Sequence, residues 1–289
     1  MKILIFGASG KIGNAVFQHL SNQYDVYGTY CKNKPNNIDD NKLRKYDIAD
    51  YNHLYNMLNN DKPDLIISSL TGDFDNQLKT HECIAKYLYE TSGRCIFISS
   101  ANVFDGSPII SHNESETPYS ISQYGKYKYS CEQMLLKSLE RNCLIIRLPR
   151  TLSCEDIKKE LQQIKNGKQV FSNLFMSYTS VNNVTNAVMY CININKSGIV
   201  HLSSNDFVSN DKFVKLLLSH TNEDISYVSA TLTIEHYCNL LGCDNPALLH
   251  KNIDGIFNLS LNSVDIEISS KFDISCDTVI SSLVNDIFL

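Results

Sequence analysis

The first half of the chain alternates short apolar runs with longer amphipathic stretches. The runs have the length of buried strands, and the stretches between them carry apolar residues at helical spacing. We predict strands at Lys2–Phe6, Val26–Tyr30, Leu43–Tyr46, Leu65–Ser69, Cys95–Ser99 and Leu144–Arg147. The predicted helices are Lys11–Leu20, Tyr51–Leu58, Leu78–Glu90 and Ser120–Glu140. Repeated strand-helix-strand units of this kind form an open parallel sheet with helices on both faces, a doubly wound α/β fold of the Rossmann type.

After Pro149 the alternation is less regular, and beyond Thr221 it gives no clear pattern. The elements expected there are helices at Glu155–Lys165, Val181–Ile192 and Lys212–Ser219, a short apolar segment at Val170–Phe171 and a strand at Ile199–Leu202. We therefore expect a nucleotide-binding domain over residues 1–150 and a smaller, mainly substrate-binding C-terminal lobe over 151–289. The segment 176–203 is expected to return to the sheet.

Composition and charge narrow the class of protein. Of 289 residues, 43% are hydrophobic and 20% are charged, which is ordinary for a globular chain and excludes disordered and fibrous classes. No apolar run approaches the length of a membrane span, and the N-terminal run ends at Gly7, too early for a secretory signal. We expect a cytoplasmic protein with no membrane partner. The net charge of −5 argues against nucleic-acid binding.

The ten cysteines contain no C-x-x-C pair, and several lie inside apolar runs. In a reducing compartment they are expected to stay reduced and to pack as small hydrophobic residues. The nearest approach to a metal cluster is His236, Cys238 and Cys243 with His250 further on. This spacing matches no zinc pattern, so no metal site is expected.

A glycine-rich loop, Gly7-Ala8-Ser9-Gly10-Lys11-Ile12-Gly13, joins the first strand to the first helix. Glycines allow the backbone to approach a pyrophosphate closely, and the helix N-terminus presents N–H groups to the anion. The spacing is G-x-x-G-x-x-G rather than G-x-G-x-x-G, and tight turns also use glycine for purely steric reasons. Because of its place in the chain, we predict nucleotide binding by Gly7, Ser9, Gly10, Lys11, Ile12 and Gly13.

The end of the second strand bears on the choice of cofactor. Its sequence Gly28-Thr29-Tyr30-Cys31-Lys32 lacks the carboxylate that binds the adenosine ribose of NAD. Lys32 and Lys11 can meet a 2′-phosphate, so NADP(H) is favoured over NAD(H), with Tyr30 beside it. The alternative is that both lysines are solvated surface residues.

Two further loops are expected to line the cofactor. Asp47, next to Ile48, can accept a hydrogen bond from the adenine amino group, whereas Asp50 is better placed to cap the next helix. The fourth strand is followed by small residues suited to close passage of the middle of the cofactor. We assign Ser69, Leu70 and Thr71 to this stretch.

The most specific pattern combines Ser100 at the end of the fifth strand with Tyr124 and, four residues later, Lys128. Residues at i and i+4 share one helical face, so a phenol and an ammonium can point together towards Ser100. A neighbouring cation lowers the pKa of a phenol and lets it exchange a proton near neutral pH. The alternative is an exposed amphipathic helix. Tyr30 and Lys34 have the same spacing without an upstream serine.

Together these motifs resemble the extended short-chain dehydrogenases/reductases. The similarity is strongest to the dTDP-4-dehydrorhamnose reductase branch, whose motif S-T-D-Y-V-F-D-G is similar to residues 99–106, Ser-Ser-Ala-Asn-Val-Phe-Asp-Gly. Residues 178–181 and 198–203 also resemble segments of that branch, as does Glu132 after the Tyr-Lys pair. The resemblance covers about residues 1–220.

The resemblance implies a catalytic triad of Ser100, Tyr124 and Lys128. Tyr124 would donate a proton to a carbonyl oxygen while NADPH delivers hydride, Ser100 would hydrogen-bond that oxygen, and Lys128 would bind the nicotinamide ribose and lower the pKa of Tyr124. Substrates of the family include nucleotide-linked 4-keto-6-deoxy sugars. Pairing of long helices between subunits in many relatives is compatible with a homodimer.

This sequence departs from the branch at Ala101, which replaces Asp, and at Asn102, which replaces Tyr. Both lie in the segment that faces the substrate, where we assign Ser100, Asn102 and Val103 to substrate binding. After the sixth strand, Arg147-Leu148-Pro149-Arg150-Thr151 replaces the usual aromatic segment. Arg150 is assigned to a substrate phosphate, with pairing at the lobe boundary as an equal alternative.

Three functions follow from these observations. The first is an NADPH-dependent reductase of a nucleotide-linked keto sugar. The second is a 4-epimerase or 4,6-dehydratase on the same fold, although Ala101 and Asn102 provide no acid for dehydration. The third is a non-catalytic, nucleotide-binding regulatory subunit.

Overall fold

The computed structural model describes residues 1–221, 223–243, 245–249 and 255–288, and the chain forms two compact units. Unit 1 consists of Met1–Ser99, Tyr127–Arg147 and Val184–Val200. Unit 2 consists of Ser100–Lys126, Leu148–Asn183 and the chain from His201 onwards. The sequence suggested a division near residue 150, with the segment 176–203 returning to the sheet. Residues 184–200 do belong to unit 1, whereas residues 100–126, which were expected in the nucleotide-binding domain, belong to unit 2.

A seven-stranded sheet forms the centre of unit 1, with strand order β11-β6-β5-β4-β1-β2-β3. Strand β1 pairs in parallel with β2 and β4, β2 with β3, and β4 with β5. The strands are β1 (Lys2–Phe6), β2 (Asp25–Tyr30), β3 (Leu43–Lys45), β4 (Leu65–Ser68), β5 (Arg94–Ser100), β6 (Cys143–Leu148) and β11 (Gly198–His201).

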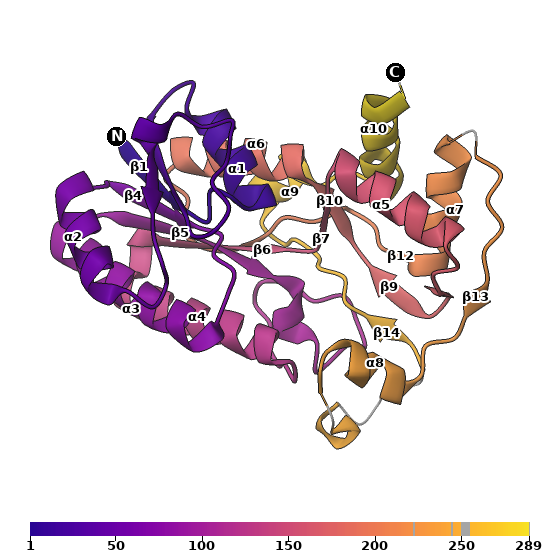
Figure 1. Cartoon of the computed structure of the whole chain (residues 1–289). Coiled ribbons are helices and arrows are strands. Elements are labelled where there is room, and N and C mark those ends of the chain that lie inside the picture. The colour runs from indigo at the N-terminus through magenta and orange to yellow at the C-terminus, as the bar shows by residue number, and fades with distance from the viewer. Residues whose placement is uncertain (222, 244, 250–254, 289) are drawn as a thin grey trace. The chain divides into compact units, whose positions relative to one another are not determined.

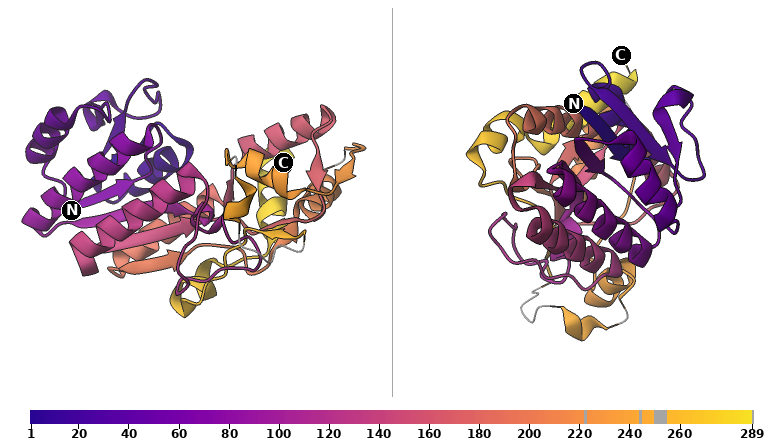
Figure 2. Two further views of the ribbon diagram at one scale, coloured as in Figure 1. Left: turned by 90° about the horizontal axis from the view of Figure 1, so that it is seen from below. Right: turned by 90° about the vertical axis from the view of Figure 1, so that its left-hand side faces the viewer.

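Helices cover both faces of this sheet (Figures 1 and 2). Figure 1 shows α1 (Lys11–Leu20) and α6 (Val181–Asn193) on one face. The opposite face carries α2 (Tyr51–Asp61), α3 (Phe74–Thr91) and α4 (Gln123–Leu139). The predicted doubly wound α/β fold is confirmed.

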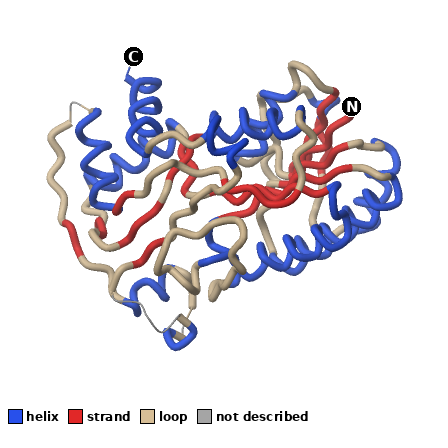
Figure 3. Tube along the Cα trace, turned by 180° about the vertical axis from the view of Figure 1, so that it is seen from behind, coloured by secondary structure: helices blue, strands red, loops and turns tan. Residues whose placement is uncertain are grey.

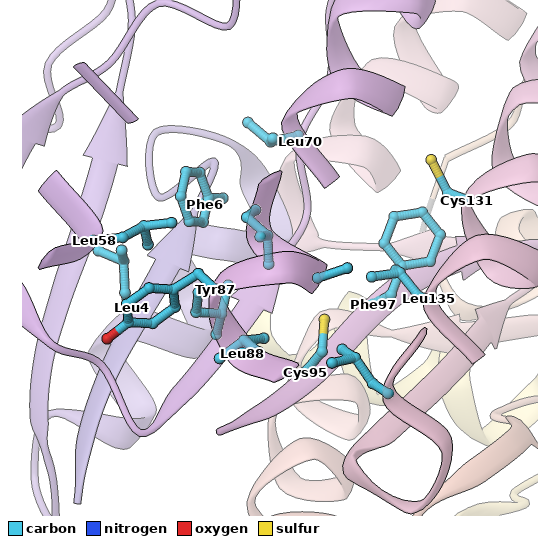
Figure 4. Packing of buried hydrophobic residues seen from close by; sticks show 14 of the residues in the cluster. Leu4, Phe6, Leu58, Leu70, Tyr87, Leu88, Cys95, Phe97, Cys131 and Leu135 are labelled. Atoms are coloured by element: carbon cyan, nitrogen blue, oxygen red, sulfur yellow. The ribbon is translucent and has the colours of Figure 1, made fainter. Parts of the chain in front are cut away.

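The central strands of unit 1 are buried on both sides, as parallel strands between two helical layers must be. All four residues of β4 and all six of β6 are buried. Figure 4 shows how Leu4 and Phe6 of β1 and Cys95 and Phe97 of β5 contribute to the core. Cys95 is 1% exposed, in agreement with the expectation that cysteines in apolar runs are packing residues.

Unit 2 contains smaller sheets and more loop, which is visible in Figure 3. The sheets have the strand orders β10-β7, β12-β9-β14 and β13-β8. Their strands are β7 (Arg150–Leu152), β8 (Val170–Phe171), β9 (Leu174–Met176), β10 (Tyr178–Ser180), β12 (Val208–Ser209), β13 (Ser229–Ala230) and β14 (Phe257–Asn258). The helices are α5 (Cys154–Lys165), α7 (Asn210–His220), α8 (Ile234–Leu240), α9 (Ile266–Phe272) and α10 (Cys276–Phe288). Short 3-10 turns complete the chain: η1 (Asp40–Lys42), η2 (Ala101–Phe104), η3 (Glu140–Asn142) and η4 (Pro246–Leu248).

The predicted elements of the first half are all present, with two helix starts shifted by three or more residues. The helix expected from Leu78 already begins at Phe74. The helix expected from Ser120 begins at Gln123, because the hydroxyls of Ser120 and Ser122 are hydrogen-bonded to Asp105 and hold the preceding residues outside the helix. Among the described residues, no helix combines the length and the apolar character needed to cross a bilayer.

Candidate active site

The glycine-rich loop after β1 is packed backbone against backbone. Gly7 has a φ of 83°, a conformation that side chains disfavour, and a Cβ there would lie 2.9 Å from the carbonyl oxygen of Ser69. A Cβ on Gly13 would lie 2.2 Å from the carbonyl oxygen of Gly7. Real Cβ atoms cannot approach so closely, so the turn and the start of α1 require glycine at both positions.

The N-terminus of α1 has the features of an anion site. Its N-cap is Gly10, which provides no side-chain cap, and the first turn contains no acidic residue. The positive end of the helix dipole and the first N–H groups are therefore not offset by a carboxylate of that turn. Together with the glycine cradle, these residues fit a pyrophosphate group.

The residues proposed to select the cofactor lie on the surface of unit 1. Lys11 and Lys32 are exposed, and Tyr30 is half-buried at the end of β2. Asp47 is also exposed, and its carboxylate accepts a hydrogen bond from the N–H of Ala49 at 3.1 Å. Asp50 caps α2, as expected from its position, by accepting from the N–H of His53 at 2.9 Å.

The loop after β4 is fixed from two sides. Ser69 donates to the carbonyl oxygen of Phe6 from its N–H at 3.0 Å and from its hydroxyl at 3.1 Å. Gln77 of α3, which is 1% exposed, donates from Nε2 to the carbonyl oxygen of Gly72 at 2.8 Å. Between these anchors, Leu70 is buried and Thr71 is exposed.

Ser100 and Tyr124 come together in unit 2. Ser100 is the last residue of β5, and its hydroxyl hydrogen-bonds the phenol of Tyr124. Tyr124 lies in the first turn of α4 and is followed by Gly125, where a Cβ would lie 2.1 Å from both the carbonyl oxygen of Asn102 and the hydroxyl oxygen of Ser120. Glycine at 125 thus permits the close approach that places the phenol beside Ser100.

The electrostatics of Tyr124 differ from the expectation that its pKa is lowered. Burial raises the pKa of Tyr124 above its ordinary value, and the hydrogen bond with Ser100 lowers it by less. In this structure the phenol is therefore protonated at neutral pH and able to donate.

Asn102 and Val103 follow Ser100 in η2. The Ser100 hydroxyl donates to Oδ1 of Asn102 at 3.0 Å and accepts from its backbone N–H at 3.2 Å. Val103 is fully buried, with neither its side chain nor its backbone open to solvent.

Lys128 lies on α4, one turn after Tyr124, and is 4% exposed. Its Nζ donates to the carbonyl oxygen of Ile98 in β5 at 2.9 Å. Burial lowers the pKa of Lys128 to about 8, while Cys131 and Glu132 oppose that shift. The ammonium remains the main form at pH 7.

A buried ion pair joins this helix to the sheet, and the sequence did not predict that its two residues are paired. Arg147 of β6 donates to Glu132 of α4, with Nη2 2.8 Å from Oε2, and the side chains are 1% and 0% exposed. Ser99 donates its hydroxyl to Oε1 of Glu132. The detectable signal is an arginine in an otherwise apolar strand, which requires a buried partner.

A second buried polar group lies between α3 and the sheet. His81 is fully buried, with Nδ1 2.6 Å from the carbonyl oxygen of Gln77 and Nε2 2.8 Å from the hydroxyl of Ser68. Burial lowers the pKa of His81 to about 4, and the charge of Lys128 contributes to the shift. The ring is therefore neutral at pH 7, and its partners could not be predicted from the sequence.

Arg150 forms an ion pair within unit 2, and its assignment to a substrate phosphate stays a prediction. Its Nη2 lies 2.6 Å from Oε2 of Glu160, which also accepts from Lys168 at 2.7 Å. In the part of the chain that the structure describes, no three His, Cys, Asp or Glu side chains gather as a metal site would require. His250 lies outside the described residues.

The chain matches the model of one protein family, described as the RmlD substrate binding domain, over residues 72–268. The match covers more than half of the sequence. The chain belongs to the RmlD substrate binding domain family. No curated protein matches it.

Solved structures of several enzymes share this fold. The dTDP-4-dehydrorhamnose reductase of Yersinia enterocolitica superposes with a TM-score of 0.77 at 20% identity over 98% of each chain. The enzyme of that name from Bacillus anthracis, in complex with NADP, gives 0.76 at 17% identity over 99% of each chain. The UDP-glucose 4-epimerase of Thermus thermophilus, in complex with NAD, gives 0.77 at 11% identity over 99% of this chain and 98% of that one.

At these identities the likeness shows a shared fold. The predicted membership of the extended short-chain dehydrogenases/reductases, near the dTDP-4-dehydrorhamnose reductase branch, is confirmed by the RmlD family match together with this fold. The chain is thus an oxidoreductase of the short-chain dehydrogenase/reductase type.

Proposed function

We propose that this chain is an NADPH-dependent reductase of a nucleotide-linked keto sugar of the 4-keto-6-deoxy type. The observation that supports this most directly is the hydrogen bond between Ser100 and Tyr124, with Lys128 one turn along the same helix. The family match and the reductases among the structures with this fold support the class of substrate.

The loop of unit 1 provides the cofactor half of the proposal. The pyrophosphate would lie against Gly7, Gly10 and Gly13 at the start of α1. These residues have no side chains, and the first turn of the helix contains no carboxylate that would compete for its N–H groups. At the end of β2 no carboxylate is present, and Lys32 would meet a 2′-phosphate. When bound, the nicotinamide cofactor supplies the hydride.

The reacting proton would come from Tyr124. Its phenol is protonated at neutral pH and can donate to the carbonyl oxygen as that oxygen gains negative charge. Ser100 would hydrogen-bond the same oxygen, which fixes the direction of proton transfer. Lys128 carries a positive charge at pH 7 and would favour the phenolate that remains on Tyr124.

The residues after Ser100 favour reduction over dehydration. Ala101 is buried and apolar, and Asn102 offers an amide that is hydrogen-bonded to Ser100. Neither can act as the acid or base that elimination of water needs. An epimerase remains distinguishable by experiment, because it would retain its cofactor through the reaction.

Consumption of NADPH at 340 nm with a panel of nucleotide-linked 4-keto-6-deoxy sugars tests the proposal. We expect oxidation with at least one sugar and a Tyr124→Phe variant that binds NADPH normally but loses at least about 100-fold in kcat. Tyr129→Phe on the same helix is the matched control and should retain wild-type turnover. Full activity of Tyr124→Phe would contradict the role of the phenol.

The same assay separates the competing functions. Tightly retained NAD with no net NADPH oxidation would indicate an epimerase, and binding without turnover of any sugar would indicate a regulatory subunit. For cofactor choice, Lys32→Ala should weaken NADPH binding about 10-fold and leave NADH binding unchanged. An equal effect on both cofactors would refute recognition of the 2′-phosphate by Lys32.

A further inference from the structure

Asp105 is a fully buried carboxylate at the end of η2 in unit 2. Its Oδ1 accepts from the hydroxyl of Ser120 at 2.7 Å, from the N–H of Ile121 at 2.8 Å and from the N–H of Ser122 at 3.3 Å. Its Oδ2 accepts from the hydroxyl of Ser122 at 2.5 Å. The donors are all neutral, and they all belong to the three residues just before α4. A buried charge with these partners fixes the course of that segment.

Ser122 passes this constraint to the helix that carries Tyr124. Its hydroxyl donates to Asp105 and accepts from the backbone N–H of Gly125 at 2.9 Å. Gly125 directly follows Tyr124, and a Cβ there would lie 2.1 Å from the carbonyl oxygen of Asn102 and from the hydroxyl oxygen of Ser120. The peptide that bears the phenol is therefore held by hydrogen bonds that begin at Asp105.

The tail of the chain holds Asp105 from the other side. The buried Tyr237 of α8 donates its hydroxyl to the carbonyl oxygen of Asp105 at 2.9 Å. The ring of Tyr237 stacks on Phe257, with 4.6 Å between centroids. No role could be predicted from the sequence for the tail beyond Thr221. Through this contact, the tail helps to support the site.

We propose that Asp105 is a positioning residue that acts through Ser122 and Gly125 to hold the phenol of Tyr124 against Ser100. A neutral amide could also bridge this loop. The hydrogen bonds of a buried carboxylate are stronger than those of an amide, so they restrict the start of α4 more tightly. The effect on turnover rests on the proposed reductase function. The placement of Tyr124 does not, so the two can be tested separately.

The kinetic test compares Asp105→Asn, Ser122→Ala and the double variant with wild type. The isosteric asparagine retains Oδ1 but replaces the acceptor of the Ser122 hydroxyl with a donor. We expect kcat to fall about 10- to 100-fold for Asp105→Asn and less for Ser122→Ala, with NADPH affinity within about twofold. Because both act through one relay, the double variant should be no slower than Asp105→Asn.

Asp156→Asn is the matched control, because Asp156 belongs to the capping box of α5, a different helix of unit 2. It should lower stability while kcat stays near wild type. Unchanged kcat in Asp105→Asn, or losses that multiply in the double variant, would overturn the proposal.

A spectroscopic test needs no substrate. The phenol of Tyr124 can be titrated by NMR of protein labelled at tyrosine Cζ, with its signal assigned by its absence in Tyr124→Phe. In the wild-type background, Ser100→Ala should raise the pKa of Tyr124, because the hydrogen bond with Ser100 lowers it. In the Ser122→Ala background, the same substitution should shift that pKa less or not at all.

Equal shifts in the two backgrounds would show that Ser122 does not hold Tyr124 in place, whatever the enzymatic outcome. Conversely, a wild-type protein that reduces no sugar but shows the unequal shifts would refute the proposed function and leave the positioning role intact.

Discussion

Arg147 and Glu132 form a two-point ion pair inside unit 1, with Nη2 2.8 Å from Oε2 and Nε 3.1 Å from Oε1. The pair joins β6 to α4 one turn beyond Lys128, and Ser99 of β5 donates to the same carboxylate. Three elements that lead into the proposed active site thus meet at one buried carboxylate. Breaking such a pair leaves an uncompensated buried charge.

Glu132→Gln is expected to lower the free energy of unfolding by about 3 to 5 kcal/mol, because Arg147 then stays buried without its counter-charge. Urea denaturation measures the change. Glu155→Gln, which breaks an exposed pair with Lys159, should change stability by no more than about 0.5 kcal/mol. Similar values for the two variants would show that the buried pair has no special importance.

Gly13→Ala should weaken cofactor binding, because the new Cβ would lie 2.2 Å from the carbonyl oxygen of Gly7 and would distort the cradle. Fluorescence titration with NADPH should show a dissociation constant raised at least about 10-fold. Gly10→Ala, whose Cβ would lie 3.3 Å from the same oxygen, should have a smaller effect. Gly167→Ala, which meets no atom within 4 Å, should leave NADPH affinity unchanged and so controls for general strain.

His81 should make the protein sensitive to acid. Its folded-state pKa of about 4 lies below the ordinary value of 6.5, so the unfolded state binds more protons between these values. The stability is therefore complete above about pH 6.5 and is lost as the pH falls towards 4. When the pH falls from 7.5 to 5, the unfolding free energy of His81→Gln should decrease by about 2 kcal/mol less than that of wild type. His53→Gln, at an exposed site, should follow the wild-type profile.

Asp273 should act in the opposite direction. Its Oδ1 is buried and has no hydrogen-bond partner among the residues that the structure describes. Burial and the nearby Glu114 raise its pKa to about 6 from an ordinary 3.8. The folded state then binds more protons than the unfolded state across this range, so stability falls as the pH rises from 3.8 to 6.

Asp273→Asn should accordingly raise the unfolding free energy by about 1 to 2 kcal/mol at pH 7.5, and by less at pH 5. Thermal or urea unfolding at the two pH values measures this difference. An equal gain at both values would assign the effect to a neutral contact rather than to the buried charge.

The strands and helices of the first half could be predicted because their signals are local. Short apolar runs, such as those at β4 and β6, form buried strands regardless of which strands they pair with. The tail could not be read in this way. Its strand β14 has two residues and its helix α8 has seven, and both depend on tertiary packing such as the stacking of Tyr237 on Phe257.

The site shows the same division between local and long-range information. Gly7, Ser100 and Tyr124 lie in motifs that can be read over a few residues. The supports of these residues join distant positions, such as Asp105 and Tyr237, which are 132 residues apart. The pKa of Tyr124 was also beyond sequence reasoning, because burial outweighs the effect expected from a helical neighbour.

The edge strand β11 affects how the protein folds during synthesis and where the chain can be truncated. It joins the sheet beside β6, yet it is encoded after most of the elements that it completes. During synthesis, the sheet stays open until about residue 200 has left the ribosome. A fragment that ends at residue 150 would lack α6 and β11 and would expose β6, an entirely apolar strand apart from Arg147, as an unpaired edge. An unpaired apolar edge strand favours aggregation. We therefore expect that residues 1–150 cannot be produced as a separate, stable domain.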